Sequence, residues 1–264
     1  MYDFAYHRPA SLEEAERLLS GASDGTLIAG GMTLIPALKQ RLASPSDVID
    51  LSGVAGLSGI SEAGGAIVVG ALTPHAAVAS DAAVTAKIPA LAALAGTIGD
   101  PQVRNRGTLG GSIATNDPVA DYPAAVLGLG ATVRTNRREI AADDFFTGMF
   151  ETALEDGEIV TAVSFPVPDK AGYTKFSNPA SRYAVVGVLV SRGPAGTRVA
   201  VTGAGPCVFR SAELEQALAG DFTAAALDAV TVAAEGLNSD IHASADYRAH
   251  LVGVMAKRAV AACG

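Results

Sequence analysis

Two glycine pairs are the residues of this sequence whose type and spacing could do chemistry. One lies in Thr108-Leu109-Gly110-Gly111-Ser112, just after Arg104 and Arg106, and the other in Ala29-Gly30-Gly31-Met32-Thr33. Glycine lets the backbone adopt positive φ and approach a ligand closely, so successive N–H groups can converge on an anion. Each pair follows an apolar run and precedes a hydroxyl residue. We predict that the two loops hold a pyrophosphate from both sides.

A third pair, Gly64-Gly65, is interpreted differently. It joins two expected strands, Leu57–Ile60 and Ala66–Val69, and no hydroxyl residue follows it. Glycine pairs are also typical of plain turns, so any one pair alone is weak evidence for a binding loop. We interpret Gly64-Gly65 as a structural turn.

The first glycine loop is expected in a small βαβ-like unit. Ser11 and Glu14 have the spacing of a capping box, and the helix they begin ends near Gly21. A strand at Thr26–Ala29, a short helix through Leu42 and a strand at Asp47–Leu51 follow. About fifty residues are a reasonable size for such a unit.

The second glycine loop is expected among helices. We predict helices from Thr73-Pro74, at Pro89–Ala95 and at Tyr122–Leu129, the first with a hydroxyl cap. The strands expected after them are Ala131–Thr135, Glu139–Ala141 and Ile159–Phe165.

Strands followed by helices indicate a separate C-terminal domain after the linker Pro166–Asp169. The expected strands are Tyr173–Phe176, Ala184–Val190 and Arg198–Thr202, and helical patterns begin near Ser211, Thr223 and Ala245. We therefore divide the chain into residues 1–168, with subdomains 1–55 and 56–168, and residues 169–264.

The composition is that of an acidic globular protein. Of 264 residues, 49% are hydrophobic and 17% charged, and the formal net charge is −8. This length allows a sizeable core, and the negative charge argues against nucleic-acid binding. The N-terminus lacks signal-peptide features, and no apolar run reaches the ~18 residues of a membrane span. We expect a cytoplasmic protein without a transmembrane segment.

Metal chemistry is not expected in this chain. Cys207 and Cys263 are its only cysteines, whereas an iron–sulfur cluster needs about four thiolates. His75 is interpreted as a packing or surface residue, and the carboxylates of Asp143-Asp144 as solvated loop charges. No catalytic residue and no metal ligand is predicted. If the protein carries electrons, an organic cofactor has to do so.

Three segments occur in a specific order: AGGMTLIP at Ala29–Pro36, GALTPHAAVA at Gly70–Ala79, and the long stretch Ile98–Ala131. With them the chain resembles, over nearly its whole length, the FAD-binding medium subunit of the molybdenum hydroxylases. This is the family of carbon monoxide dehydrogenase and xanthine dehydrogenase. The resemblance implies an α+β fold, with a two-subdomain FAD-binding domain of the PCMH/vanillyl-alcohol-oxidase type and a smaller C-terminal α+β domain.

The resemblance also implies which residues bind FAD. The pyrophosphate would lie on Ala29, Gly30, Gly31, Met32, Thr33, Thr108, Leu109, Gly110, Gly111 and Ser112. Asp121 would make a polar contact on the flavin side, Val160 a backbone contact, and Lys175 would lie near FAD. Asp121 could also cap the helix that starts at Tyr122, and Lys175 could lie on a solvated strand face.

Two departures from the family pattern concern the flavin ring. Ile98 replaces an aromatic residue that some relatives place against the ring. Ser181-Arg182-Tyr183 lacks a carboxylate that many relatives carry before the aromatic residue. The resemblance therefore leaves ring packing and this one contact undecided.

The resemblance implies a three-part oxidoreductase, assembled as a dimer of heterotrimers. A large molybdopterin subunit would hydroxylate the substrate, and a small subunit would carry two [2Fe–2S] clusters. The FAD of this chain would pass electrons to an external acceptor. A stand-alone FAD-dependent reductase of the same fold and a scaffold without cofactor are the alternatives. The substrate and the acceptor are not specified by this sequence.

Overall fold

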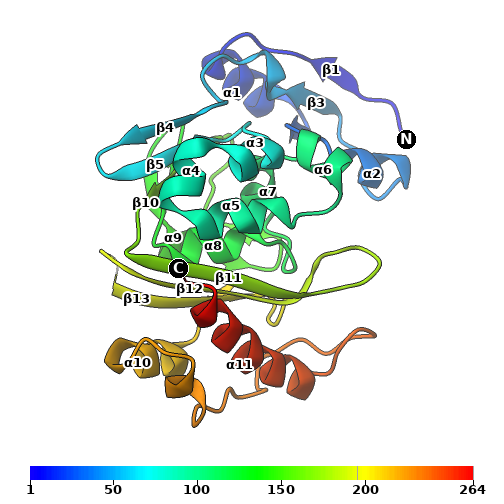
Figure 1. Cartoon of the computed structure of the whole chain (residues 1–264). Coiled ribbons are helices and arrows are strands. Elements are labelled where there is room, and N and C mark those ends of the chain that lie inside the picture. Colours follow the sequence, from blue (N-terminus) through cyan, green and yellow to red (C-terminus); the bar gives the residue numbers. More distant parts are fainter. Residues whose placement is uncertain (195, 264) are drawn as a thin grey trace.

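The computed structural model describes residues 1–194 and 196–263. Its N-terminal part, at the top of Figure 1, is a small parallel sheet of order β1-β3-β2 with two helices. Alternating strands and helices favour such a parallel arrangement. The elements are β1 (Ala5–His7), α1 (Leu12–Gly21), β2 (Gly25–Ile28), α2 (Leu34–Lys39), β3 (Asp47–Asp50) and a 3-10 turn (Leu51–Gly53).

Helix α1 begins at the predicted capping box. The Ser11 hydroxyl accepts a hydrogen bond from the backbone N–H of Glu14 at 3.2 Å. The Glu14 carboxylate reaches back to the N–H of Ala10 at 2.9 Å, one residue before the cap itself. Both bonds satisfy backbone donors that the helix leaves free. The fully buried Ala15 then packs the helix on Ile49 of β3.

The middle of the chain forms a five-stranded antiparallel sheet of order β4-β5-β10-β6-β7. Its strands are β4 (Ile60–Ala63), β5 (Ala66–Gly70), β6 (Thr132–Thr135), β7 (Glu139–Ala141) and β10 (Val160–Pro166). Between β5 and β6 run α3 (His75–Ser80), α4 (Ala82–Lys87), α5 (Pro89–Gly96), α6 (Pro101–Arg106), α7 (Leu109–Thr115) and α8 (Tyr122–Gly128). Helix α9 (Ala142–Phe145) and the pair β8 (Phe146–Gly148) and β9 (Glu151–Thr152) precede β10.

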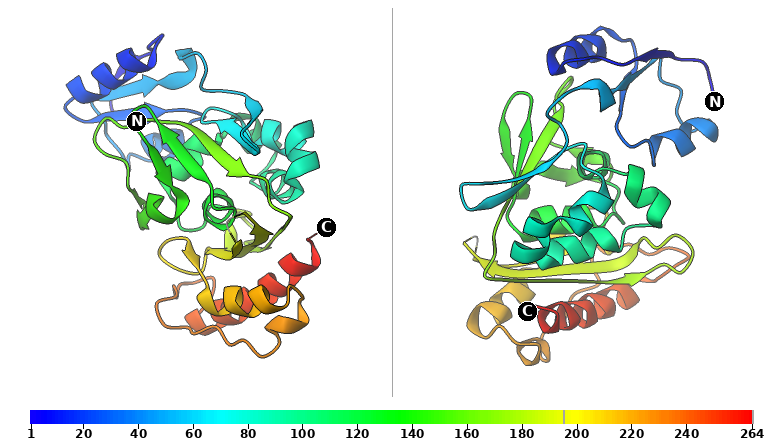
Figure 2. Two further views of the ribbon diagram at one scale, coloured as in Figure 1. Left: turned by 90° about the vertical axis from the view of Figure 1, so that its left-hand side faces the viewer. Right: turned by 45° about the horizontal axis from the view of Figure 1, so that its top comes forward.

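The last part contains an antiparallel sheet of order β11-β12-β13-β14. Helices α5 and α8 cover one face, and α10 and α11 lie against the other (Figure 2). Because both faces are covered, β12 is buried along most of its length. The elements are β11 (Lys170–Ser177), β12 (Ala184–Gly193), β13 (Gly196–Thr202), β14 (Phe209–Arg210), α10 (Ala212–Gly220), a 3-10 turn (Ala225–Leu227) and α11 (Ala245–Ala261).

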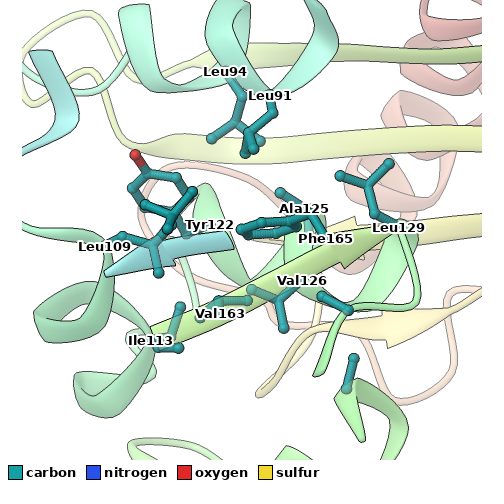
Figure 3. Close-up of a cluster of buried hydrophobic side chains, with 14 of the residues drawn as sticks. Leu91, Leu94, Leu109, Ile113, Tyr122, Ala125, Val126, Leu129, Val163 and Phe165 are labelled. Carbon is teal, nitrogen blue, oxygen red and sulfur yellow. The ribbon is translucent and has the colours of Figure 1, made fainter. Parts of the chain in front are cut away.

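The largest core lies between the middle sheet and its helices. Figure 3 shows Leu91 and Leu94 of α5 close to Tyr122 of α8 and Phe165 of β10. The same core continues to the third sheet, because a Cβ on Gly128 of α8 would lie only 2.6 Å from the Leu189 side chain of β12. Glycine is therefore needed there for close packing, and the two parts share one hydrophobic interior.

Two predicted elements differ from the structure near the second sheet. The helix expected from Thr73-Pro74 begins at His75 without a side-chain cap, because the Thr73 hydroxyl bonds the backbone of Gly59 instead. The strand expected at 57–60 lies at Ile60–Ala63. In the first case a hydrogen bond to a separate backbone segment overrides the local cap pattern. In the second, β4 pairs with β5 across the tight turn Gly64-Gly65, and this register places the strand next to the turn.

One predicted helix near the C-terminus is almost absent. The pattern from Thr223 gives only the 3-10 turn Ala225–Leu227. Val230, Thr231 and Val232 follow, and β-branched residues disfavour helix.

An ion-pair clasp joins α1 to the turn between β6 and β7. Glu16 accepts a hydrogen bond from Arg137 at 2.6 Å and another from the side chain of Asn136 at 3.0 Å. Arg137 also donates to the carbonyl of Asp156 at 3.0 Å. The clasp therefore connects the N-terminal part to the middle part at a point where the chain is not continuous.

The carboxylate of Glu158 closes the base of the same turn. It is fully covered and accepts hydrogen bonds from Arg138 at 3.0 Å, from the Thr135 hydroxyl at 2.7 Å and from the N–H of Glu155 at 2.9 Å. The hydrogen bond from Arg138 is the main reason that the pKa of Glu158 falls to about 2. The ionised form is thus the one that the fold stabilises.

We predict that Glu158→Gln lowers the free energy of unfolding by about 2 kcal/mol at pH 7. The folded-state pKa lies below the unfolded value, so this contribution is full above pH ~5 and is lost as pH falls towards 2. Urea denaturation of wild type and variant at pH 7 and pH 3 measures it. Glu139→Gln, at the exposed partner of Arg134, should change stability by less than about 0.5 kcal/mol. A Glu158→Gln effect of equal size at both pH values would contradict the assignment.

Candidate functional site

A cavity of about 860 Å³ lies between the N-terminal part of the chain and the middle part. This volume is in the range of small-molecule and cofactor sites, roughly 300 to 1,000 Å³. Its wall includes the end of α1 with the segment that leads into β2, the loop after β2, the start of α7, the turn before β10, and the group Ile98, Asp121 and Tyr183.

The two glycine loops meet in the wall of this cavity. A Cβ added to Gly30 would lie 1.9 Å from the carbonyl oxygen of Arg106 and 2.9 Å from the Cα of Gly107. A Cβ on Gly111 would lie 3.7 Å from the Ala29 side chain. Any side chain at position 30 would therefore force the loops apart. The predicted approach of two segments about eighty residues apart in sequence is confirmed.

The first loop presents a row of free backbone donors. Among the described residues, the N–H groups of Gly30, Gly31, Met32 and Thr33 have no hydrogen-bond acceptor. All four residues line the cavity, and Gly31 has φ of +73°, a conformation that favours glycine. Unpaired N–H groups in a concave wall form an anion-binding surface. This loop has the geometry that a pyrophosphate requires.

The second loop differs from the prediction in how it contributes. Its N–H groups are already used within the protein: Leu109 donates to the carbonyl of Thr73, Gly110 to that of Ala71, and Gly111 to the Thr108 hydroxyl. A row of free N–H donors is therefore absent from this described segment. Gly110 is required because a Cβ there would lie 2.5 Å from that of Ala71. The loop offers the cavity its hydroxyl groups and a surface without side chains.

At the other end of the cavity, Asp121 is held by two buried partners. Its carboxylate accepts a hydrogen bond from Tyr173 and forms an ion pair with Lys175 at 3.0 Å. Burial, followed by the adjacent carboxylate charge, raises the pKa of Tyr173 well above its usual value, so the phenol stays protonated and donates. Asp121 makes no cap bond to the helix that follows. Asp121 thus occupies the N-cap position of α8, but its carboxylate does not cap the helix, and the alternative of a solvated Lys175 is wrong.

His75 lines the cavity as a neutral ring. Burial, assisted by the charge of Arg104, lowers the pKa of His75 to about 4. Its Nδ1 has no partner among the described residues, and the same holds for the hydroxyl of Tyr122, whose ring centre lies 5.2 Å away. The expected packing role is consistent with this burial.

Nearly all predicted site residues lie in the cavity wall. These are Ala29, Gly30, Gly31, Met32, Thr33, Thr108, Gly110, Gly111, Ser112, Asp121 and Val160. Leu109 does not line the cavity, because its fully buried side chain belongs to the core (Figure 3). Lys175 also lies outside the wall, behind Asp121.

The chain matches known protein families along almost its whole length. Residues 2–168 match the FAD binding domain in molybdopterin dehydrogenase, and residues 175–263 match the CO dehydrogenase flavoprotein C-terminal domain. The chain belongs to this family of flavoprotein subunits. The resemblance, the α+β fold and FAD as the cofactor, all predicted from the sequence, are confirmed.

Relatives of this flavoprotein family cover nearly all of the chain. The nicotine 6-hydroxylase medium subunit of Paenarthrobacter nicotinovorans is 38% identical over 98% of this chain and 96% of its own length. The carbon monoxide dehydrogenase medium chain of Hydrogenophaga pseudoflava is 36% identical over 97% and 96%. The structure of reconstituted CO dehydrogenase from Oligotropha carboxidovorans aligns with a TM-score of 0.91 at 34% identity, covering 98% of this chain and 97% of that chain.

The residues present fit the FAD of this family. A dinucleotide needs a cavity of this size, a donor surface for its diphosphate and polar groups near its ring. The free N–H groups of Gly30–Thr33 supply the donor surface, and Ser112, whose hydroxyl has no hydrogen-bond partner among the described residues, lines the same cavity. Asp121 and Tyr183 supply polar groups at the other end.

The sequence interpretation missed one end of the cavity. The segments around Ser20–Gly25 and Glu155–Ile159 line it. Asp117, whose pKa is raised by burial, was missed as well and lies near Tyr183, whose pKa its charge raises. The only sign of this end in the sequence was a glycine, Gly157, within a run of acidic residues. In the structure Gly157 has a φ of +75°. Such a run looks like solvated loop in a sequence, and only the clasp with α1 places it beside the cavity.

Two further properties concern metals and membranes. The described residues contain no group of three or more histidine, cysteine or carboxylate side chains that could hold a metal ion. None of the helices described is both long enough and apolar enough to cross a membrane.

We predict that Gly31→Ala lowers FAD affinity by about tenfold or more, because the positive φ that keeps the loop N–H groups facing the cavity becomes unfavourable. Gly65→Ala is the matched control. Gly65 has nearly the same φ, +77° against +73°, but lies in open space in the turn between β4 and β5. The positive φ should cost both variants about 1 kcal/mol of stability, and Gly31→Ala should lose somewhat more, because its Cβ would lie 2.7 Å from Cδ1 of Ile35. Equal FAD retention in the two, measured by equilibrium dialysis, would remove Gly31 from the site.

Proposed function

We propose that this chain is the flavin subunit of a molybdenum–iron–sulfur hydroxylase, receiving electrons from an iron–sulfur subunit and passing them to an external acceptor. The observation that carries the proposal is the meeting of the two glycine loops at a cavity with a row of free backbone donors. One relative is the medium chain of carbon monoxide dehydrogenase, and another is subunit alpha of the 6-hydroxypseudooxynicotine dehydrogenase complex, which supports partner subunits for this chain.

In this proposal the diphosphate of FAD lies between Ala29–Thr33 and Thr108–Ser112. The N–H groups of the first loop donate to the phosphate oxygens, and the Thr108 and Ser112 hydroxyls face them. Val160 lies in the wall at the end bordered by the clasp, and Asp121 lies at the end with Tyr183. FAD, when bound, supplies the capacity to take up and release electrons. The chain positions the cofactor and shields it from water.

The assembly that we propose is a dimer of heterotrimers with one small iron–sulfur subunit and one large molybdopterin subunit per flavin subunit. We propose the cytoplasm as its compartment, since Cys207 and Cys263 are free thiols, as expected in a reducing environment. We also propose that the domain boundary lies at residues 168 and 169, between β10 and β11.

We predict that the protein isolated from its own cells contains FAD and co-purifies with an iron–sulfur chain and a molybdenum chain. When the chemically reduced iron–sulfur partner is mixed with this chain under anaerobic conditions, the visible flavin absorption should bleach. A chain that carries FAD and has no such partners would be a stand-alone reductase. A chain that binds no FAD would contradict the proposal entirely.

We further predict that a holoenzyme carrying Gly31→Ala and depleted of FAD still passes electrons from substrate to its iron–sulfur clusters but no longer reduces the acceptor. The reason is that the chemistry upstream of the flavin does not involve this chain. Cluster reduction is followed by electron paramagnetic resonance, with the Gly65→Ala holoenzyme as control. Loss of cluster reduction in the depleted enzyme alone would place an earlier step on this chain.

A further inference from the structure

The ammonium of Lys175 on β11 is buried behind one end of the cavity. Its side chain is only 5% exposed. Nζ contacts the Asp121 carboxylate at 3.0 Å, the carbonyl of Thr97 at 3.1 Å and the carbonyl of Arg182 at 2.9 Å. An ammonium has three N–H donors, so all of them are used within the protein. No donor remains for a ligand.

The three partners of Lys175 belong to three separate segments of the cavity rim. Asp121 itself lines the cavity. Thr97 is followed by Ile98, and Arg182 is followed by Tyr183; both following residues line the cavity as well. Lys175 is not part of the wall. One cation thus connects three segments of this end of the site.

The segment that contains Arg182 needs such support. Arg182 has φ of +63°, which costs a non-glycine residue of the order of 1 kcal/mol. Its side chain donates to the carbonyl of Gly99 at 3.1 Å, and Arg104 donates to that same oxygen at 3.0 Å. The strained loop and the Gly99 turn are therefore tied to each other as well as to Lys175.

We propose that Lys175 is a positioning residue that fixes three segments of the rim around the flavin ring through its hydrogen bonds to Asp121, Thr97 and Arg182. Burying a cation and a carboxylate is costly unless both are fully bonded, and the geometry here bonds both. The cofactor part of the inference rests on the proposed function. The part about the rim concerns the protein alone.

The test uses hydrogen exchange of the FAD-free chain, with four variants. Lys175→Met removes the ammonium and leaves the buried Asp121 carboxylate without its ion-pair partner, which destabilises the fold. The double variant K175M/D121N removes both charges. D121N alone keeps the ammonium with its bonds to Thr97 and Arg182. Lys170→Met, at the exposed start of the same strand, is the matched control.

The reporting amides are those of Ile98, which donates to the carbonyl of Ala95, and of Arg182, which donates to that of Asn178. In K175M/D121N both should exchange about tenfold faster or more than in wild type. The amide of Gly110, in the opposite wall, should not change. D121N and Lys170→Met should behave as wild type. Unchanged exchange in the double variant, or an equal rise in D121N, would overturn the proposal.

A second measurement adds FAD. The flavin fluorescence of K175M/D121N should be quenched more strongly by iodide than that of wild type, since a loose rim exposes the ring. Equal quenching alongside faster exchange would show that the rim does not cover the ring, which overturns the cofactor part. If wild type binds no FAD while the exchange pattern holds, the proposed function fails and the positioning role of Lys175 stands.

Discussion

The contact between Gly30 and the carbonyl of Arg106 is the constraint on which the rest of the structure depends. A backbone oxygen occupies the place where any other residue would carry its Cβ. The N-terminal unit can therefore approach the middle unit closely enough to share a cavity wall. The free N–H groups of the next three residues face that cavity as a result. A single missing side chain sets the width of the site.

The two glycine loops have different physical roles although their sequences look alike. In the first, the backbone donors are unpaired and available to a ligand. In the second, Gly110 donates to Ala71 and packs against it, so its glycine is required by the protein interior. Sequence patterns of this kind indicate close approach of the backbone to something. They do not distinguish approach to a ligand from approach to another part of the chain.

Local patterns predicted the parts of the fold that depend on local physics. The capping box at Ser11, the helix at Tyr122 and the turn at Gly64-Gly65 all depend on neighbouring residues and were found. The missing cap at Thr73 and the burial of Lys175 depend on residues far along the chain. For the site, the ordered motifs and the family resemblance located one wall. The sequence did not indicate that the segments near Glu155 and Ser20 line the cavity, because their position depends on how the N-terminal part packs against the middle part.

The clasp between Glu16 and Arg137 has a practical consequence. Both side chains are about a third exposed, so dissolved salt screens their attraction. The neighbouring segments around Ser20 and Asp156 line the cavity, and Arg137 of the clasp donates a hydrogen bond to the carbonyl of Asp156. A buffer of high salt concentration would therefore weaken the clasp and loosen the segments of the cavity wall beside it. A preparation that arrives colourless from an ion-exchange column would report the chromatography and not the native composition of the enzyme.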